Sequence, residues 1–283
     1  MVAALGGVDL AGELVPLVAE ALDALLVPLS GADAESQLDG LGSYDFGQLF
    51  EFLEQHRETL GIQRLGQLEW AYLGALGHEP SVPTLYEALA EDPAFFVRVV
   101  SAIYKPHSAE AAEPDDAARR AAENGFHLLS AWHRVPGEAD DGIIDEEALR
   151  TWAEKARELL AAADRLQAGE GQIGAILAYA HQDADGAWPP EPVRNALEHL
   201  DSRAVERGMA TAKYNSRGVV SKSIDAGGEA EHELADGFEK QAKGFRDRWP
   251  RSAAVLGDLA ASYRRDARRG DEEAEQRRQG FDR

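Results

Sequence analysis

The chain has 283 residues, of which 44% are hydrophobic, enough to bury a sizeable core and too many for wholesale disorder. Its formal net charge of −22 disfavours nucleic acid and anionic membranes as partners and favours a basic one. It has no cysteine, which excludes disulfides, thiolate metal sites and cysteine catalysis.

The first predicted element is an amphipathic helix over residues 14–29. Glu20 and Asp23 face away from an apolar stripe that we expect to pack on a core, formed by Leu14, Val18, Leu22, Leu25 and Leu29. The segment is too short and too charged to cross a membrane. No basic region precedes it, so we expect no secretory signal and, since cysteine is also absent, a cytoplasmic chain.

Helices around residues 46–56 and 65–76 come next, and two more follow, each with its own start signal. Ser81 opens the first of these, and Asp92 followed by Pro93 opens the second, because proline at the first helical position loses no hydrogen bond. The second has one apolar face, formed by Phe95, Phe96, Val99, Val100, Ile103 and Tyr104. Short helices joined by proline-marked turns are typical of an all-helical array.

A long helix is predicted to start after Asp145 and to continue to residue 166. Asp145 is the expected N-cap, and Ile144 and Leu149 occupy the two positions of a hydrophobic staple. Further helices are predicted over residues 117–134, 173–181, 193–200, 201–214, 229–248 and 251–269. No strict repeat and no sustained strand pattern occur. The sequence therefore predicts an all-α fold, an irregular stack of helical hairpins (HEAT-like or a bundle array) without a substantial sheet.

The expected domain organisation follows composition and charge. Residues 1–104 form an acidic N-terminal helical subdomain, since residues 1–56 contain ten acidic side chains and no Lys or Arg. Residues 105–116 form a polar linker with two prolines. Residues 117–269 form a C-terminal helical subdomain, and residues 270–283 form a charged tail that we expect to fray.

Three stretches approach metal-site patterns without completing them. The helical zinc-protease signature begins at His232 but needs a second His where Asp236 stands. The Asp-Gly stretches ending at Gly142 and Gly186 suggest calcium loops, but an EF-hand alignment places Ala148 or Pro192 at the position of the bidentate Glu. Both stretches are better interpreted as turns. We expect no metal, no cofactor and no catalytic residue.

Residues 215–228 form a glycine- and serine-rich loop that could bind an anion through Arg217, Ser221, Lys222 and Ser223. It lacks the Gly-Lys-Ser/Thr ending of a phosphate-binding P-loop, and an ordinary surface crossing is the simpler interpretation.

A possible basic contact patch follows one helix side and comprises Arg264, Arg265, Arg268 and Arg269. Cations at that position also stabilise the negative end of a helix, and acidic residues follow at once. With the net charge of the whole chain, this makes nucleic acid an unlikely partner.

Four motifs resemble the C-terminal, all-helical region of very large bacterial proteins, from actinobacteria and proteobacteria, that are loosely labelled helix-turn-helix or addiction-module proteins. They occur between residues 43 and 274 and are the stretches 68–72, 91–100, 130–137 and 248–252. The motifs are structural, so they carry over no catalytic residue. The resemblance implies that the chain is a piece of a longer protein linked to defence or toxin systems.

From the sequence we expect a non-enzymatic helical scaffold that binds another protein or domain through its acidic N-terminal half. The alternative is an enzyme or small-molecule sensor with an anionic ligand at residues 215–228, where a cleft with perturbed ionisable groups would favour that alternative.

Overall fold

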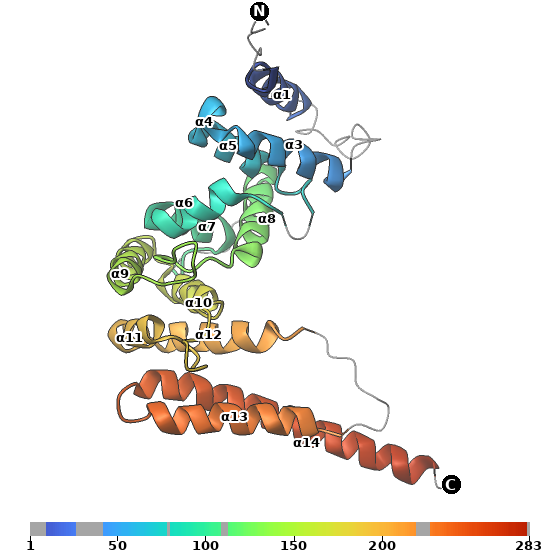
Figure 1. Ribbon diagram of the computed structural model, residues 1–283, viewed down its shortest axis with the longest axis vertical. Helices are drawn as coiled ribbons and strands as arrows, with labels where there is room; N and C mark the ends of the chain where they lie inside the picture. The colour runs from blue at the N-terminus through green and yellow to red at the C-terminus, as the bar shows by residue number, and fades with distance from the viewer. Residues whose placement is uncertain (1–9, 27–41, 78–79, 109–112, 219–226, 282–283) are drawn as a thin grey trace, which may run out of the picture. The chain divides into compact units, whose positions relative to one another are not determined.

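The computed structural model describes residues 10–26, 42–77, 80–108, 113–218 and 227–281 (Figure 1). Within these ranges the chain forms thirteen helices and no sheet, which confirms the predicted all-α class. One isolated antiparallel bridge in this part of the chain joins Glu138 to Ile144. No helix of the described ranges is both long and apolar enough to cross a membrane.

The chain divides into two compact units that do not follow the expected boundary. Unit 1 comprises Met1–Leu89 and Ala111–Trp132, and unit 2 comprises Ala90–Glu110 and His133–Arg283. A division at residues 105–116 would separate the helix after Pro93 from those that follow. In the structure that helix groups with unit 2, and the helix after the expected linker groups with unit 1.

Unit 1 contains α1 (Leu10–Leu26), α3 (Ser43–Gln55), α4 (Arg57–Leu60), α5 (Ile62–Tyr72) and α8 (Asp116–Ala131), together with most of α6 (Pro83–Glu91). Its core includes a cluster of three aromatic rings. The ring centroid of Tyr72 lies 5.2 Å from that of Phe46 and 5.8 Å from that of Phe50. The Tyr72 hydroxyl donates a hydrogen bond to the Leu22 carbonyl, at 2.6 Å, and so ties α5 to α1.

The buried stripe of α1 differs from the predicted one. Val15, Ala19 and Leu22 are buried, whereas Leu14, predicted to face the core, is 49% exposed. Because α1 carries apolar side chains on several faces, periodicity alone does not determine which face packs. The contacts of α1 with α4 and α5 make that choice.

Unit 2 is a stack of packed helices, as the sequence predicts for this part (Figure 1). It contains α7 (Pro93–Ile103), α9 (Glu146–Ala162), α10 (Leu166–Leu177), α11 (Glu191–Leu200), α12 (Arg203–Asn215), α13 (Glu229–Phe245) and α14 (Pro250–Phe281). Helix α9 packs on α7 and α11, α10 packs on α12, and both α11 and α12 pack on α14. Helices α13 and α14 form the most extensively packed pair.

The predicted start of α7 is confirmed, and its apolar face is confirmed in part: Phe96, Val99 and Val100 are buried, whereas Phe95, Ile103 and Tyr104 are half-buried. The Asp92 carboxylate accepts a hydrogen bond from the Ala94 N–H at 2.9 Å, and Pro93 occupies the first turn. Phe96 is fully buried, with its ring centroid 5.0 Å from that of Trp152 on α9. The face therefore belongs to the core of unit 2.

Several helix boundaries differ from the prediction: α1 and α10 begin four and seven residues earlier than expected, and the ends of α9 and α14 also differ. Helix α9 ends at Ala162 instead of continuing to residue 166, because Asp164 adopts a left-handed conformation with φ of 56°. Ser108 stabilises that turn, since its N–H and its hydroxyl both donate to the Asp164 carboxylate, at 2.7 and 2.6 Å. Helix α14 continues through the expected charged tail to Phe281, where good helix formers and i,i+4 pairs such as Glu273–Arg277 favour it.

Glycines allow α10 and α12 to approach each other closely. A Cβ added at Gly174 would lie 2.0 Å from the Val205 carbonyl oxygen, and one added at Gly208 would lie 2.1 Å from the Gly171 carbonyl oxygen. No side chain fits at either position without moving a backbone. The two helices are therefore in direct backbone contact at the centre of the unit.

Candidate functional site

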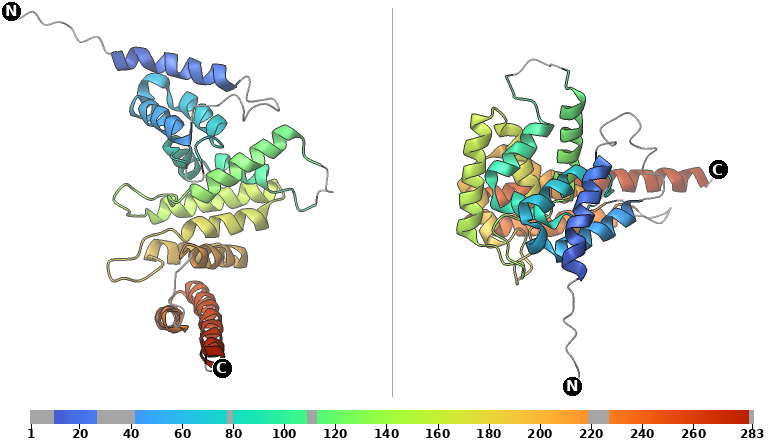
Figure 2. Two further views of the ribbon diagram at one scale, coloured as in Figure 1. Left: turned by 90° about the vertical axis from the view of Figure 1, so that its right-hand side faces the viewer. Right: turned by 90° about the horizontal axis from the view of Figure 1, so that it is seen from above.

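Two loops of unit 2, residues 133–145 and 181–190, extend from the same side of the unit (Figure 2, left). Each contains one of the Asp-Gly turns that the sequence predicts, with Gly142 and Gly186 both at φ of +80°. A side-chain carboxylate closes each turn by accepting a backbone N–H, at 3.0 Å for Asp141 and 2.9 Å for Asp185. The turn interpretation is therefore confirmed.

A cavity of about 830 Å³ lies between these loops. Its lining includes four carboxylates, those of Glu138, Asp140, Asp141 and Asp183. Arg134 is the one Lys or Arg in the lining, which also contains the apolar or aromatic side chains of His133, Ile143, Ile144, His181, Pro190 and Pro192. The cavity thus combines an excess of negative charge with apolar surface.

Glu138 organises one wall of the cavity. Its side chain is 10% exposed, and its carboxylate accepts the Val135 N–H at 2.9 Å and contacts Nδ1 of His181 at 3.2 Å. The Arg134 guanidinium donates to the Glu138 carbonyl at 3.0 Å and lies 3.4 Å from the Asp140 carboxylate. These contacts fix the loop, so that the wall does not depend on a ligand for its shape.

Asp183 anchors the opposite wall. Its carboxylate accepts the Glu191 N–H at 3.1 Å and forms a 2.7 Å ion pair with Arg194, a buried residue on α11. The Arg194 guanidinium lies against two rings, 4.5 Å from the centroid of Phe245 and 4.2 Å from that of Trp249. Asp183 therefore already has a cationic partner, whereas Asp140 and Asp141 stand at the exposed rim.

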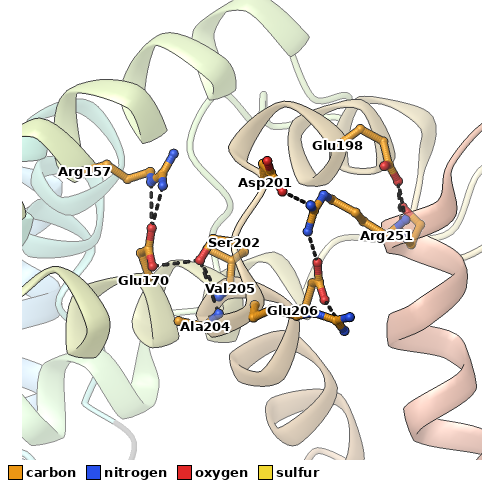
Figure 3. A network of polar contacts seen from close by, with 11 residues as sticks. Arg157, Glu170, Glu198, Asp201, Ser202, Ala204, Val205, Glu206 and Arg251 are labelled. Carbon is orange, nitrogen blue, oxygen red and sulfur yellow. Dashed lines mark hydrogen bonds and ion pairs between the residues drawn. The ribbon is translucent and has the colours of Figure 1, made fainter.

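A network of polar contacts around buried carboxylates joins helices of unit 2 (Figure 3). Glu170 on α10 accepts hydrogen bonds from Arg157 at 2.8 Å and from the Ser202 hydroxyl at 2.7 Å. The Ser202 hydroxyl in turn accepts backbone N–H groups at the start of α12, at 3.2 and 3.4 Å. The chain of contacts joins α9, α10 and α12, and each polar group in it has a partner.

Arg251 connects the next layer (Figure 3). Its guanidinium forms ion pairs with Asp201 and with the buried Glu206, while the Glu198 carboxylate accepts the Arg251 N–H at 2.9 Å. Sequence reasoning missed this network, because its members are far apart along the chain and each is unremarkable in its own helix. Its satisfied ion pairs indicate a structural role, since buried charges without partners are costly.

The residues predicted to bind an anion have an internal partner where the structure describes them. Arg217 forms a 2.8 Å ion pair with Glu231, which is 4% exposed, and its guanidinium lies 5.6 Å from the Tyr263 ring centroid. Ser221, Lys222 and Ser223 lie outside the described residues. The positive charge of Arg217 is therefore already neutralised by Glu231, which weakens the case for an anion at this end of the loop.

The predicted basic patch on α14 is partly neutralised as well. Arg264 forms ion pairs with Asp236 and Glu239, and Arg269 pairs with Asp266 at 2.9 Å. Arg265 donates to the Ser262 hydroxyl, and Arg268 is exposed. All four arginines belong to α14, but because two of them form ion pairs, the patch carries less positive charge than the sequence suggests.

The near-complete zinc motif is not assembled into a metal site in the part of the chain that the structure describes. His232 contacts the Asp271 carboxylate through Nε2 at 3.0 Å, beside the start of α13. No cluster of three or more His, Asp or Glu side chains in the described ranges could hold a metal ion.

No family model, curated protein or solved structure matches this chain. The resemblance to large bacterial helical proteins therefore stays a prediction. Within the described ranges, the cavity between the two loops combines a volume of about 830 Å³, several carboxylates and walls held by hydrogen bonds.

Proposed function

We propose that the chain is a protein-binding helical module and that its cavity accepts a basic segment of a partner protein. The observation that carries this proposal is the lining of the cavity, where four carboxylates, of which Asp183 is already paired with Arg194, lie with one lining guanidinium beside the exposed side chain of Ile143. A cationic side chain of the partner would pair with the carboxylates, and an apolar neighbour in the same peptide would cover Ile143.

The size and stiffness of the site support this proposal. A volume of about 830 Å³ falls within the range of roughly 300–1,000 Å³ that ligand sites occupy. Both loops are fixed by hydrogen bonds of their own, at Val135 and at Glu191, so little ordering entropy is lost on binding. A rigid helical stack that presents such a site is typical of interaction scaffolds.

Charge outside the cavity supports the same class of partner. The net charge of −22 and the ten acidic residues in the first 56 attract a basic protein over a distance of about a Debye length. Association with such a partner becomes slower as salt increases. The alternative, an anionic ligand at residues 215–228, gains no support from Arg217, because that cation already pairs with Glu231.

The test is a selection of displayed random peptides on the intact chain, followed by affinity measurement at low and physiological salt. We expect enrichment of peptides with Arg or Lys beside an apolar residue, and affinities that fall with salt. The double variant Asp140→Asn, Asp141→Asn should lose most of the binding while keeping the fold, because both side chains are exposed.

The matched control is Glu147→Gln, Glu158→Gln on α9. These side chains are 73% and 68% exposed, and the substitution removes the same charge as the cavity variant. It should retain wild-type affinity. Equal losses in both variants, or selected peptides without basic residues, would rule out the cavity as the binding site.

A further inference from the structure

One wall of the cavity carries an aromatic platform beside the carboxylates. The His133 ring stacks on the Tyr179 ring, with centroids 3.9 Å apart and planes inclined by 22°. Tyr179 covers one face of the imidazole and does not line the cavity, whereas His133 does. The His133 ring is therefore held against Tyr179 on one face, while the residue itself is exposed and lines the cavity.

A guanidinium already occupies this environment. Arg134, the neighbour of His133 in the chain, donates two hydrogen bonds to the Glu138 carbonyl and reaches Asp140 at the rim. These contacts show that this wall provides a carbonyl and a carboxylate oxygen that accept hydrogen bonds from a guanidinium. Asp141 uses one oxygen for the Ile143 N–H and has no Lys or Arg partner among the described residues, so it can accept a further donor.

We propose that the cavity selects arginine over lysine in the basic segment of the partner, an inference that rests on the proposed function. The planar guanidinium stacks on His133, as such groups do on aromatic faces, and its fork of N–H donors reaches the Asp141 carboxylate at the rim. An apolar residue next to the arginine covers Ile143, whose side chain is 68% exposed.

Lysine meets only part of this site. Its ammonium is a compact, strongly hydrated point charge that gains from the carboxylates but has no plane to stack on His133. The stacking contribution corresponds to an affinity difference of about tenfold. Citrulline keeps the planar shape and loses the charge, so it separates stacking from charge attraction.

The experiment titrates three blocked, fluorescently labelled peptides into the intact chain at constant ionic strength. The peptides are identical except for arginine, lysine or citrulline beside a leucine. We expect the arginine peptide to bind about tenfold more tightly than the lysine peptide. His133→Ala should bring the two affinities close together, and His133→Phe, which keeps a flat ring, should preserve the preference.

The outcomes separate this inference from the proposed function. If arginine and lysine peptides bind equally, and both lose affinity in the Asp140→Asn, Asp141→Asn variant, arginine selection is refuted and the binding module stands. An unchanged preference in His133→Ala also refutes it. Binding of none of the peptides refutes both proposals. Thermal melts of each variant confirm that the fold is intact, as expected for substitution of the exposed His133.

Discussion

Glu69 on α5 makes the stability of unit 1 depend on pH. Its side chain is 1% exposed, and its carboxyl accepts the Leu85 N–H at 2.9 Å, so that it caps the start of α6 from a neighbouring helix. Burial, the largest cause, and the nearby Glu54 carboxylate together raise the pKa of Glu69 to about 8, against 4.5 for an ordinary glutamate. Hydrogen bonds from backbone N–H groups and the charge of Arg57 act in the opposite direction.

The sign of the effect follows from proton binding. Between pH 4.5 and about 8 the folded chain holds a proton on Glu69 that the unfolded chain has released. The free energy of unfolding therefore decreases as pH rises through this window. Each pH unit corresponds to about 1.4 kcal/mol. The full interval then amounts to an upper limit of about 5 kcal/mol, and other titrating groups add their own pH dependence.

Glu69→Gln isolates the contribution of this group, since glutamine keeps a hydrogen-bond acceptor and cannot ionise. Urea unfolding of the wild type and the variant from about pH 5 to about pH 9 should give stabilities that diverge as pH rises, with the variant more stable at high pH. Glu58→Gln, an exposed position in the same unit, should follow the wild type. Parallel curves for wild type and Glu69→Gln would refute the reasoning.

Three further substitutions test the packing and the caps. Gly208→Ala should lower the free energy of unfolding by about 1–3 kcal/mol, because the added Cβ would meet the Gly171 carbonyl. Gly257→Ala is the control, and with open space around it the substitution should be neutral or stabilising. Equal urea midpoints for the two variants would contradict the close packing of α10 and α12. Phe96→Ala should lower stability by about 3–5 kcal/mol, and an unchanged melting temperature would remove this residue from the core. Asp145→Ala should cost about 1 kcal/mol through loss of its bond to the Ala148 N–H, which calorimetry can measure.

Local signals in the sequence were sufficient for most helices. Asp92 and Asp145 cap the helices they were predicted to cap, because capping depends only on residues within one turn. The break at Asp164 could not be predicted in the same way, since its left-handed turn is stabilised by Ser108, which is distant in the chain. The buried face of α1 was likewise determined by tertiary contacts rather than by its own periodicity.

The candidate site was visible in the sequence only as separate parts. The turns at Gly142 and Gly186 were recognised, but no pattern indicated that loops about forty residues apart enclose one cavity. The stacking of His133 on Tyr179 could not be predicted either, because the two residues are far apart in the chain. The burial of Glu69 also escaped notice, because a glutamate within a helix is usually exposed.

Hydrogen–deuterium exchange of the intact chain, with and without the tightest peptide from the display selection, locates the binding site most directly. If the cavity is the site, amides in residues 134–145 and 181–190 should be protected by the peptide, and those along α14 and in residues 213–218 should be unchanged. Protection along α14 or in residues 213–218, with no change in the two loops, would contradict the proposed function.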